Sequence, residues 1–155
     1  MKKNTNYVDE TRHFERMLRE YHYYCKKYLD HMKEARRLSL LLDEELEARG
    51  INYQSTGASG SSYMVSTYAN ELILLQASEE EEAKKAEREF MRIDRTEKLN
   101  ERIGRLSMED RLLIESRYFD EMTLKSIAKS MNYSDHTYIQ KRINRVLEKM
   151  VAMEP

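Results

Sequence analysis

Helix breakers are nearly missing from this chain, and their scarcity limits the folds open to it more than any other feature of the sequence. Of the 155 residues only Pro155 is a proline, and only four are glycines. In a helix interior, proline and glycine cost about 3 and about 1 kcal/mol relative to alanine, so long stretches without either favour long helices. The sequence therefore predicts an all-α fold.

An apolar pattern of helical spacing runs from about Val8 to Arg49. The first stripe, in which His31 fills one place, advances by three or four residues and comprises Phe14, Met17, Tyr21, Tyr24, Tyr28, Ala35, Leu38 and Leu42. A second stripe lies beside it and comprises Leu18, Cys25, Met32 and Leu46. So broad an apolar face suits a coiled-coil-like helix with more than one neighbour, and we expect it to form a homo-oligomer, a dimer. A tyrosine-lined surface for a ligand or for stacked bases is the alternative.

Gly50 is the predicted end of this helix, and the segment QSTGASGSS at residues 54–62 is predicted to be a Gly/Ser-rich loop. A phosphate-binding loop would need Gly-Lys-Ser/Thr at its end, and no lysine follows here. A second helix is predicted from Tyr63 to about Arg105, with the charged run at residues 78–89 facing solvent.

Several classes of protein are disfavoured. Cys25 is the only cysteine, which excludes an internal disulfide and fits a reducing compartment, so we expect a cytoplasmic protein. No run of eighteen apolar residues is present, so we expect no membrane helix. His13, His22 and His31 lie nine residues apart without an i, i+4 pair, and no nucleophile–base constellation is visible. We therefore expect neither an enzyme nor a bound metal or other cofactor.

The stretch from Thr123 to Lys141 has the local features of a helix-turn-helix. Ala128 is the small residue needed where two helices cross, Asn132 tolerates the left-handed backbone of the turn, and Ser134 is placed to cap the next helix. Further packing residues complete the predicted core of the motif, which comprises Ile127, Ala128, Met131, Tyr133, Tyr138 and Ile139. Upstream, Ser107 with Asp110 resembles a capping box that starts an earlier helix.

A family resemblance rests on residues spread from Leu106 to Leu147. They are Leu106, Leu112-Leu113, Arg117-Tyr118-Phe119, Thr123-Leu124, Ile127-Ala128, Tyr133-Ser134 and Val146-Leu147. This pattern resembles region 4 of bacterial sigma factors, a helical domain that reads a promoter element through a helix-turn-helix. In its order of parts the whole chain resembles phage and prophage late-gene transcription regulators of the ArpU and RinA type. The resemblance implies a helical, oligomerising region at 1–92 and a sigma region 4-like domain at 93–155.

The resemblance implies double-stranded DNA as the partner. It leaves open whether the protein also contacts host RNA polymerase. Although the whole chain carries a net charge of −1, residues 123–155 contain six basic and three acidic residues, which fits an anionic partner. The function expected is sequence-specific transcription regulation, with activation of phage late genes implied by the family. The alternatives are a DNA-recognition subunit of a phage packaging machine, similar to a small terminase, and a minimal sigma-like factor.

The sequence allows two rotations of the last helix about its own axis. An apolar stripe at Ile139, Ile143, Val146, Leu147 and Met150 can face inward, or Tyr138 can do so, as in the sigma pattern. With the stripe inward, the residues predicted to read bases are Asp135, His136, Thr137, Gln140, Lys141 and Asn144. The residues predicted to hold phosphates are Lys125, Ser134, Arg142, Arg145 and Lys149.

Overall fold

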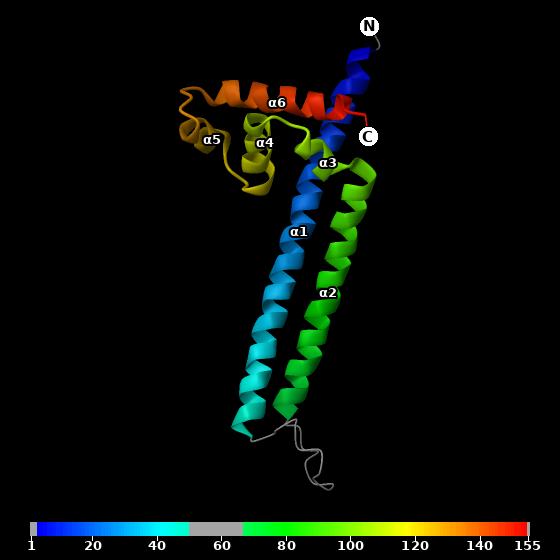
Figure 1. Ribbon diagram of the computed structural model, residues 1–155, viewed down its shortest axis with the longest axis vertical. Helices are drawn as coiled ribbons and strands as arrows, with labels where there is room; N and C mark the ends of the chain where they lie inside the picture. Colours follow the sequence, from blue (N-terminus) through cyan, green and yellow to red (C-terminus); the bar gives the residue numbers. More distant parts are fainter. Residues whose placement is uncertain (1–2, 50–66, 155) are drawn as a thin grey trace. The chain divides into compact units, whose positions relative to one another are not determined.

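Every element of the computed structural model is helical over the residues it describes, 3–49 and 67–154 (Figure 1). The elements are α1 (Lys3–Ala48), α2 (Thr67–Glu97), α3 (Leu99–Gly104), α4 (Met108–Ile114), the π-helical turn η1 (Glu115–Phe119), α5 (Leu124–Ser130) and α6 (His136–Ala152). The all-α prediction is confirmed. Gly50 and the loop at 54–62 lie outside the described residues. None of the helices described is both long enough and apolar enough to cross a membrane.

The chain packs into two compact units that do not follow the predicted boundary at residue 92. One unit contains the chain up to Tyr24 together with the chain from Glu89 onward; we call it the helix-turn-helix unit. The other spans Cys25 to Arg88, and we call it the hairpin unit. The first half of α1 therefore belongs with the C-terminal helices, although the sequence assigned it to a separate N-terminal region.

The hairpin unit consists of the second half of α1 and most of α2, which run side by side in opposite directions (Figure 1). Its buried apolar side chains are Ala35, Leu38, Leu46, Ala69, Leu72, Ala83 and Ala86. Ala35, Leu38 and Leu46 belong to the stripes expected for the first helix, whereas Ala83 and Ala86 are buried within the run that was expected to face solvent. The alanines let two backbones approach closely. A hydrogen bond between His31 Nδ1 and the Glu79 carboxylate joins the two helices. The charged run is exposed for the most part, with pairs such as Lys85–Glu82 at 2.9 Å along its surface.

The core of the helix-turn-helix unit joins residues from both ends of the chain. Phe14 and Leu18 of α1 are 2% and 0% exposed within it. The other buried members are Ile93, Leu99, Ile103, Leu106, Leu113, Ile114, Tyr118, Ile127, Ala128, Ile139, Ile143, Val146, Leu147 and Met150. The Tyr118 hydroxyl donates to Glu15 of α1 at 3.1 Å, and its burial beside that carboxylate raises the pKa of the phenol. The apolar stripe of α1 is thus largely covered inside the chain.

The single helix predicted from Tyr63 to Arg105 is broken at Lys98, which adopts a left-handed backbone with φ 54°. A non-glycine residue in this region costs on the order of 1 kcal/mol or more, so surrounding contacts must hold it there. The Lys98 amide donates to the Asp94 carbonyl at 2.7 Å, and the Asn100 amide donates to the Asp94 carboxylate at 2.9 Å. Burial of Leu99 and Ile103 after the corner stabilises the change of direction.

Candidate nucleic-acid interface

The end of α5 has the geometry that the sequence of the turn predicts, with Asn132 in the left-handed region. Thr123 caps α5, its hydroxyl accepting from the Ser126 amide at 3.1 Å. Asn132 takes a left-handed backbone with φ 60°. The Tyr133 amide donates to the Ala128 carbonyl at 2.8 Å, and the Asn132 amide donates to the Lys129 carbonyl at 3.3 Å. These two bonds form a Schellman motif, which ends α5 sharply and lets α6 start after a short turn.

The cap of α6 is Asp135, so the prediction that Ser134 caps this helix is wrong by one residue. The Asp135 carboxylate accepts from the Thr137 amide at 2.9 Å, and this bond lowers the pKa of the carboxyl. Ser134 is exposed and precedes the cap. Asp135 therefore serves as the N-cap of α6. Its charge is negative, like that of the phosphates in a nucleic-acid backbone.

The rotation of α6 follows the apolar stripe. Ile139, Ile143, Val146, Leu147 and Met150 are all at most 3% exposed. Tyr138, by contrast, is 45% exposed, so its assignment to the core of the motif is wrong. Its ring instead lies 5.0 Å from that of Tyr133, centroid to centroid, at the edge of the turn. Ile139 is buried in preference to Tyr138 because the isoleucine side chain has no hydroxyl that would need a buried hydrogen-bond partner.

The outward face of α6 centres on Lys141 and Arg145. With about 100° between successive residues, these two lie opposite the buried stripe, and Thr137 and Asn144 lie together on one side of them. All four side chains are exposed. Neither Lys141 nor Arg145 makes an ion pair or side-chain hydrogen bond among the described residues. Arg145, predicted to hold a phosphate, is therefore as central to this face as Lys141.

Gln140 and His136, which were also predicted to read bases, differ in their exposure and in their contacts. Gln140 is half-buried, and its Nε2 donates to Asn144 Oδ1 at 2.8 Å. His136 is exposed at the start of α6, with its Nδ1 4.0 Å from the Asp135 carboxylate. The amide pair and the histidine both lie along the N-terminal two-thirds of the helix.

Arg142 and Lys149 are both paired with acidic residues of α4, Arg142 mostly covered and Lys149 at the surface, so a phosphate would have to compete with these pairs. Arg142 donates to Glu109 Oε1 at 2.7 Å and to the Tyr133 hydroxyl at 3.2 Å. Lys149 donates to the Asp110 carboxylate at 3.4 Å. The pairing lowers the pKa of the Glu109 carboxyl and raises that of Arg142. The acidic first turn of α4, begun by the Ser107 cap as predicted, thus neutralises one side of α6.

The α5 helix contributes a second basic residue that the sequence analysis did not single out. Lys129 follows Lys125 by four residues, and residues at this spacing share one face of a helix. Both are exposed and neither has an ion-pair partner among the described residues. The spacing of four was the signal that could have identified Lys129.

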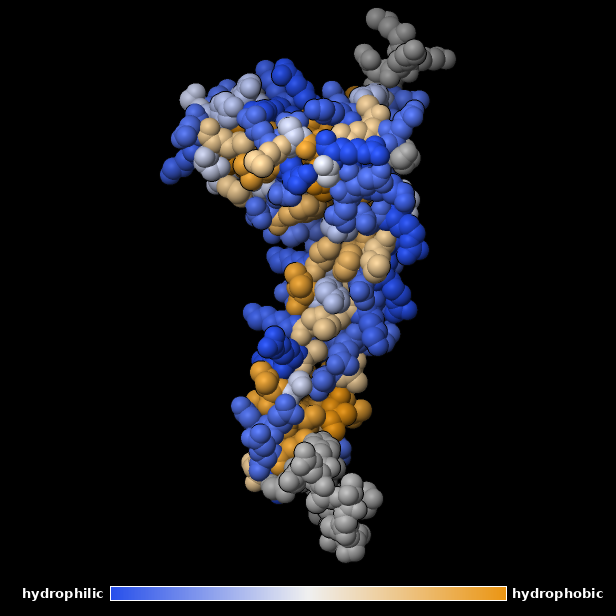
Figure 2. Space-filling model, viewed as in Figure 1, coloured by the Kyte–Doolittle hydropathy of each residue, from blue (hydrophilic) through white to orange (hydrophobic). Residues whose placement is uncertain are grey.

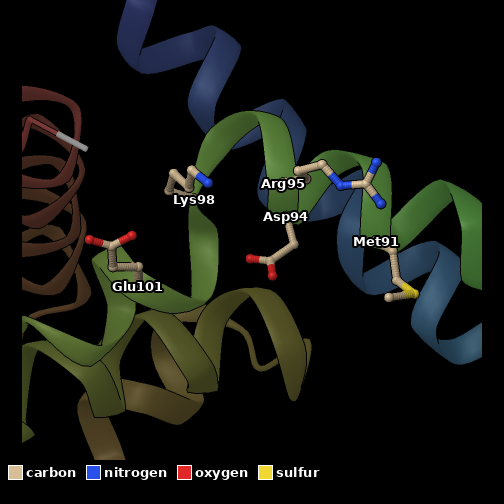
Figure 3. Close-up of a pocket in the computed structure, with 5 residues that line it drawn as sticks. All are labelled: Met91, Asp94, Arg95, Lys98 and Glu101. Atoms are coloured by element: carbon tan, nitrogen blue, oxygen red, sulfur yellow. The ribbon is translucent and has the colours of Figure 1, made fainter.

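Besides a groove of about 580 Å³ that is lined by Asp9, Glu10, His13, Glu97 and Arg102 among others, two smaller open grooves in this unit have mixed charge. The first, of about 370 Å³, lies at the α2–α3 corner, where Figure 3 shows Arg95 and Lys98 alternating with the Asp94 and Glu101 carboxylates. The second, of about 260 Å³, lies between the start of α1 and the edge of α6 and is lined by Arg12, Asn144 and Glu148 among others. There the Tyr7 hydroxyl donates to the Glu148 carbonyl at 3.0 Å. The described residues contain no group of three or more potential metal ligands.

No protein-family description, curated protein sequence or solved structure matches this chain. The resemblance to sigma region 4 and to late-gene regulators therefore depends on the residues quoted for it.

Proposed function

We propose that this protein is a sequence-specific DNA-binding transcription regulator that inserts α6 into the major groove. The observation that supports the proposal best is the pair Lys141 and Arg145, exposed and unpaired on the face of α6 opposite its buried stripe. This helix directly follows a tight helix-turn-helix turn, and a single helix of this kind fits the width of the major groove.

Base reading is assigned to Lys141 and to the Gln140–Asn144 pair. Because the Gln140 amide nitrogen donates to the Asn144 carbonyl, the pair leaves the Gln140 oxygen as an acceptor and the Asn144 amide as a donor. Adenine presents the complementary set in the major groove, an N7 acceptor and an N6 donor. Lys141 is suited to the acceptors of guanine. Thr137 and His136, which lie nearer the start of the helix, are the next candidates for base contacts.

Phosphate binding is assigned to Lys125, Lys129 and Arg145. All three are exposed and lack ion-pair partners among the described residues, so no intramolecular bond must break when they bind an anion. The first helix of a helix-turn-helix crosses the DNA backbone, which suits the two lysines of α5. Each phosphate contact adds about 0.9 to the slope of log affinity against log salt concentration.

The regulatory role remains the one that the resemblance implies, activation of phage late genes, with host RNA polymerase as the candidate protein partner. Protein-bound fragments should first be selected from a phage or prophage genome, and affinity for the selected site should then be compared with affinity for random duplex. The Lys141→Ala variant is expected to lose part of its preference for the site, about 1–3 kcal/mol, since that is what one good base contact discriminates.

A matched control is Arg95→Ala, which removes an exposed cation at the α2–α3 corner, away from the proposed DNA face. It should bind like the wild-type protein. If Lys141→Ala and Arg145→Ala also bind like the wild type, or if the protein enriches no sequence, the proposed function is wrong.

A further inference from the structure

Tyr138 is an apolar ring exposed on the helix that we assign to the major groove. α6 is described along its whole length, and its other large apolar side chains are buried or half-buried. Tyr138 itself is 45% exposed. Figure 2 shows hydrophilic colours over much of the visible surface of the helix-turn-helix unit. The ring of Tyr138 is therefore an apolar group beside a mainly polar face.

Tyr138 belongs to the outward face of α6. It precedes Lys141 by three residues and Arg145 by seven, spacings that place side chains on one side of a helix. At about 100° per residue, Tyr138 lies next to Arg145, on the side of the basic pair opposite to Thr137. It is the third residue of α6, and the first residues of a recognition helix are those that contact base edges. If α6 enters the groove as proposed, this ring enters with it.

The ring of Tyr138 is supported by the ring of Tyr133. Their centroids are 5.0 Å apart, and their planes are inclined by 42°. Tyr133 in turn packs against the core of the unit. This contact restricts the rotamers of Tyr138, and a side chain that is already ordered in the free protein loses less entropy when it binds. The Tyr138 hydroxyl has no hydrogen-bond partner among the described residues, so no bond within the protein must break first.

Thymine is the base whose edge suits an aromatic ring. In the major groove it presents a C5-methyl group, whereas the other three bases are recognised there by their hydrogen-bond donors and acceptors. Packing a methyl group against the ring removes apolar surface of both from water. A contact of Tyr138 with the sugar-phosphate backbone would hold position but would not read sequence.

We infer that Tyr138 is a specificity-determining residue that reads a thymine by packing its ring against the C5-methyl group. The inference rests on the proposed function, because it needs α6 in the major groove. It adds thymine to the adenine and guanine contacts assigned to Gln140–Asn144 and Lys141. The contact needs the ring and does not need the hydroxyl.

The test replaces thymidine by deoxyuridine, one position at a time, in the duplex selected from a phage or prophage genome. Deoxyuridine lacks only the methyl group and keeps the base pair. At one position the wild-type protein should lose about fourfold in affinity, the equivalent of the about 0.8 kcal/mol assigned to one buried CH₂ group. Tyr138→Ala should bind the selected duplex more weakly and show no further loss at that position. Tyr138→Phe keeps the ring and should show the same loss as the wild type.

Two control variants separate the ring of Tyr138 from other causes. Thr137→Ser removes a methyl group on the other side of the basic pair and should leave the deoxyuridine effect unchanged. Tyr23→Ala removes a tyrosine of α1 that is 58% exposed and should bind every duplex like the wild type. Because Tyr138 is half-exposed, Tyr138→Ala should keep the helical signal in circular dichroism. If it does not, Tyr138→Gln decides the question in the same way.

The outcomes distinguish this inference from the proposed function. A protein that selects no sequence overturns both. A protein that selects a site but tolerates deoxyuridine at every thymine overturns the inference alone, and so does a selected site without thymine. The inference is also wrong if the deoxyuridine effect persists in Tyr138→Ala, or if Thr137→Ser or Tyr138→Phe abolishes it.

Discussion

Replacing Leu18 by alanine tests whether the first half of α1 is part of the DNA-binding unit. Leu18 is 0% exposed, and its neighbours in the core include residues of α3, α4 and α6. Leucine-to-alanine changes at such sites cost about 2–5 kcal/mol, because the lost transfer free energy is joined by the cost of the cavity left behind. The loss is a large share of the 5–15 kcal/mol that typically stabilises a folded domain.

The matched control is Leu29→Ala, the same chemical change on the same helix. Leu29 is 64% exposed, so its replacement should alter the free energy of unfolding by only about 0.5 kcal/mol. Alanine has the higher helix propensity in both variants, so this contribution cancels in the comparison.

Amide hydrogen exchange in α6 is the assay, since Ile143 and Leu147 lie far from Leu18 in sequence. Each 1.4 kcal/mol of lost stability speeds exchange by global unfolding about tenfold. Leu18→Ala should therefore speed exchange by a factor between about thirty and several thousand. Leu29→Ala should leave these amides protected. Unchanged protection of α6 in Leu18→Ala would show that residues 93–155 fold without α1 and would refute the reasoning.

Further expected outcomes concern the turn and α6. Asp135→Ala should lower the free energy of unfolding by about 1 kcal/mol in urea titrations through loss of its cap, whereas Asp135→Asn should keep the cap and tighten DNA binding by removing a negative charge. Gln140→Ala should relax preference at one base pair in a binding-site selection without changing the salt slope. Lys125→Ala should weaken binding to all sequences and flatten that slope by about one. Arg142→Met, which frees Glu109, should reduce stability in urea by about 1 kcal/mol and leave sequence preference unchanged; a changed preference would return Arg142 to the interface.

The features that the sequence predicted well are those fixed by neighbours along the chain. Asn132 in the left-handed region, Ala128 at the helix crossing and the Ser107 cap all depend on residues within a few positions. The apolar stripe of α6 was also visible, although the sigma pattern offered Tyr138 as a rival. Burial decided between them, because a leucine- and isoleucine-rich stripe loses no hydrogen bonds to water when it is covered.

The features that were missed depend on distant residues. Nothing near Arg142 indicates that Glu109 will hold it, and nothing near Phe14 indicates that α6 helps to cover it. Lys98 carries no glycine or proline to mark its left-handed backbone, which is imposed by packing on either side of the corner. Such contacts form only when the core is assembled. A pattern of helical spacing predicts which face of a helix is apolar, but not which neighbour covers that face.

The sharing of α1 between two units has a consequence for the order of folding during synthesis. In the helix-turn-helix unit, Tyr118 bonds to Glu15 across 103 residues and Tyr7 bonds to Glu148 across 141 residues. The hairpin unit is closed by nearer pairs, such as His31 with Glu79 across 48 residues. Because residues are made in order and long loops close slowly, the hairpin can form while α6 is still inside the ribosome. Phe14 and Leu18 are synthesised early, so the core that buries them is complete only after α6 has emerged.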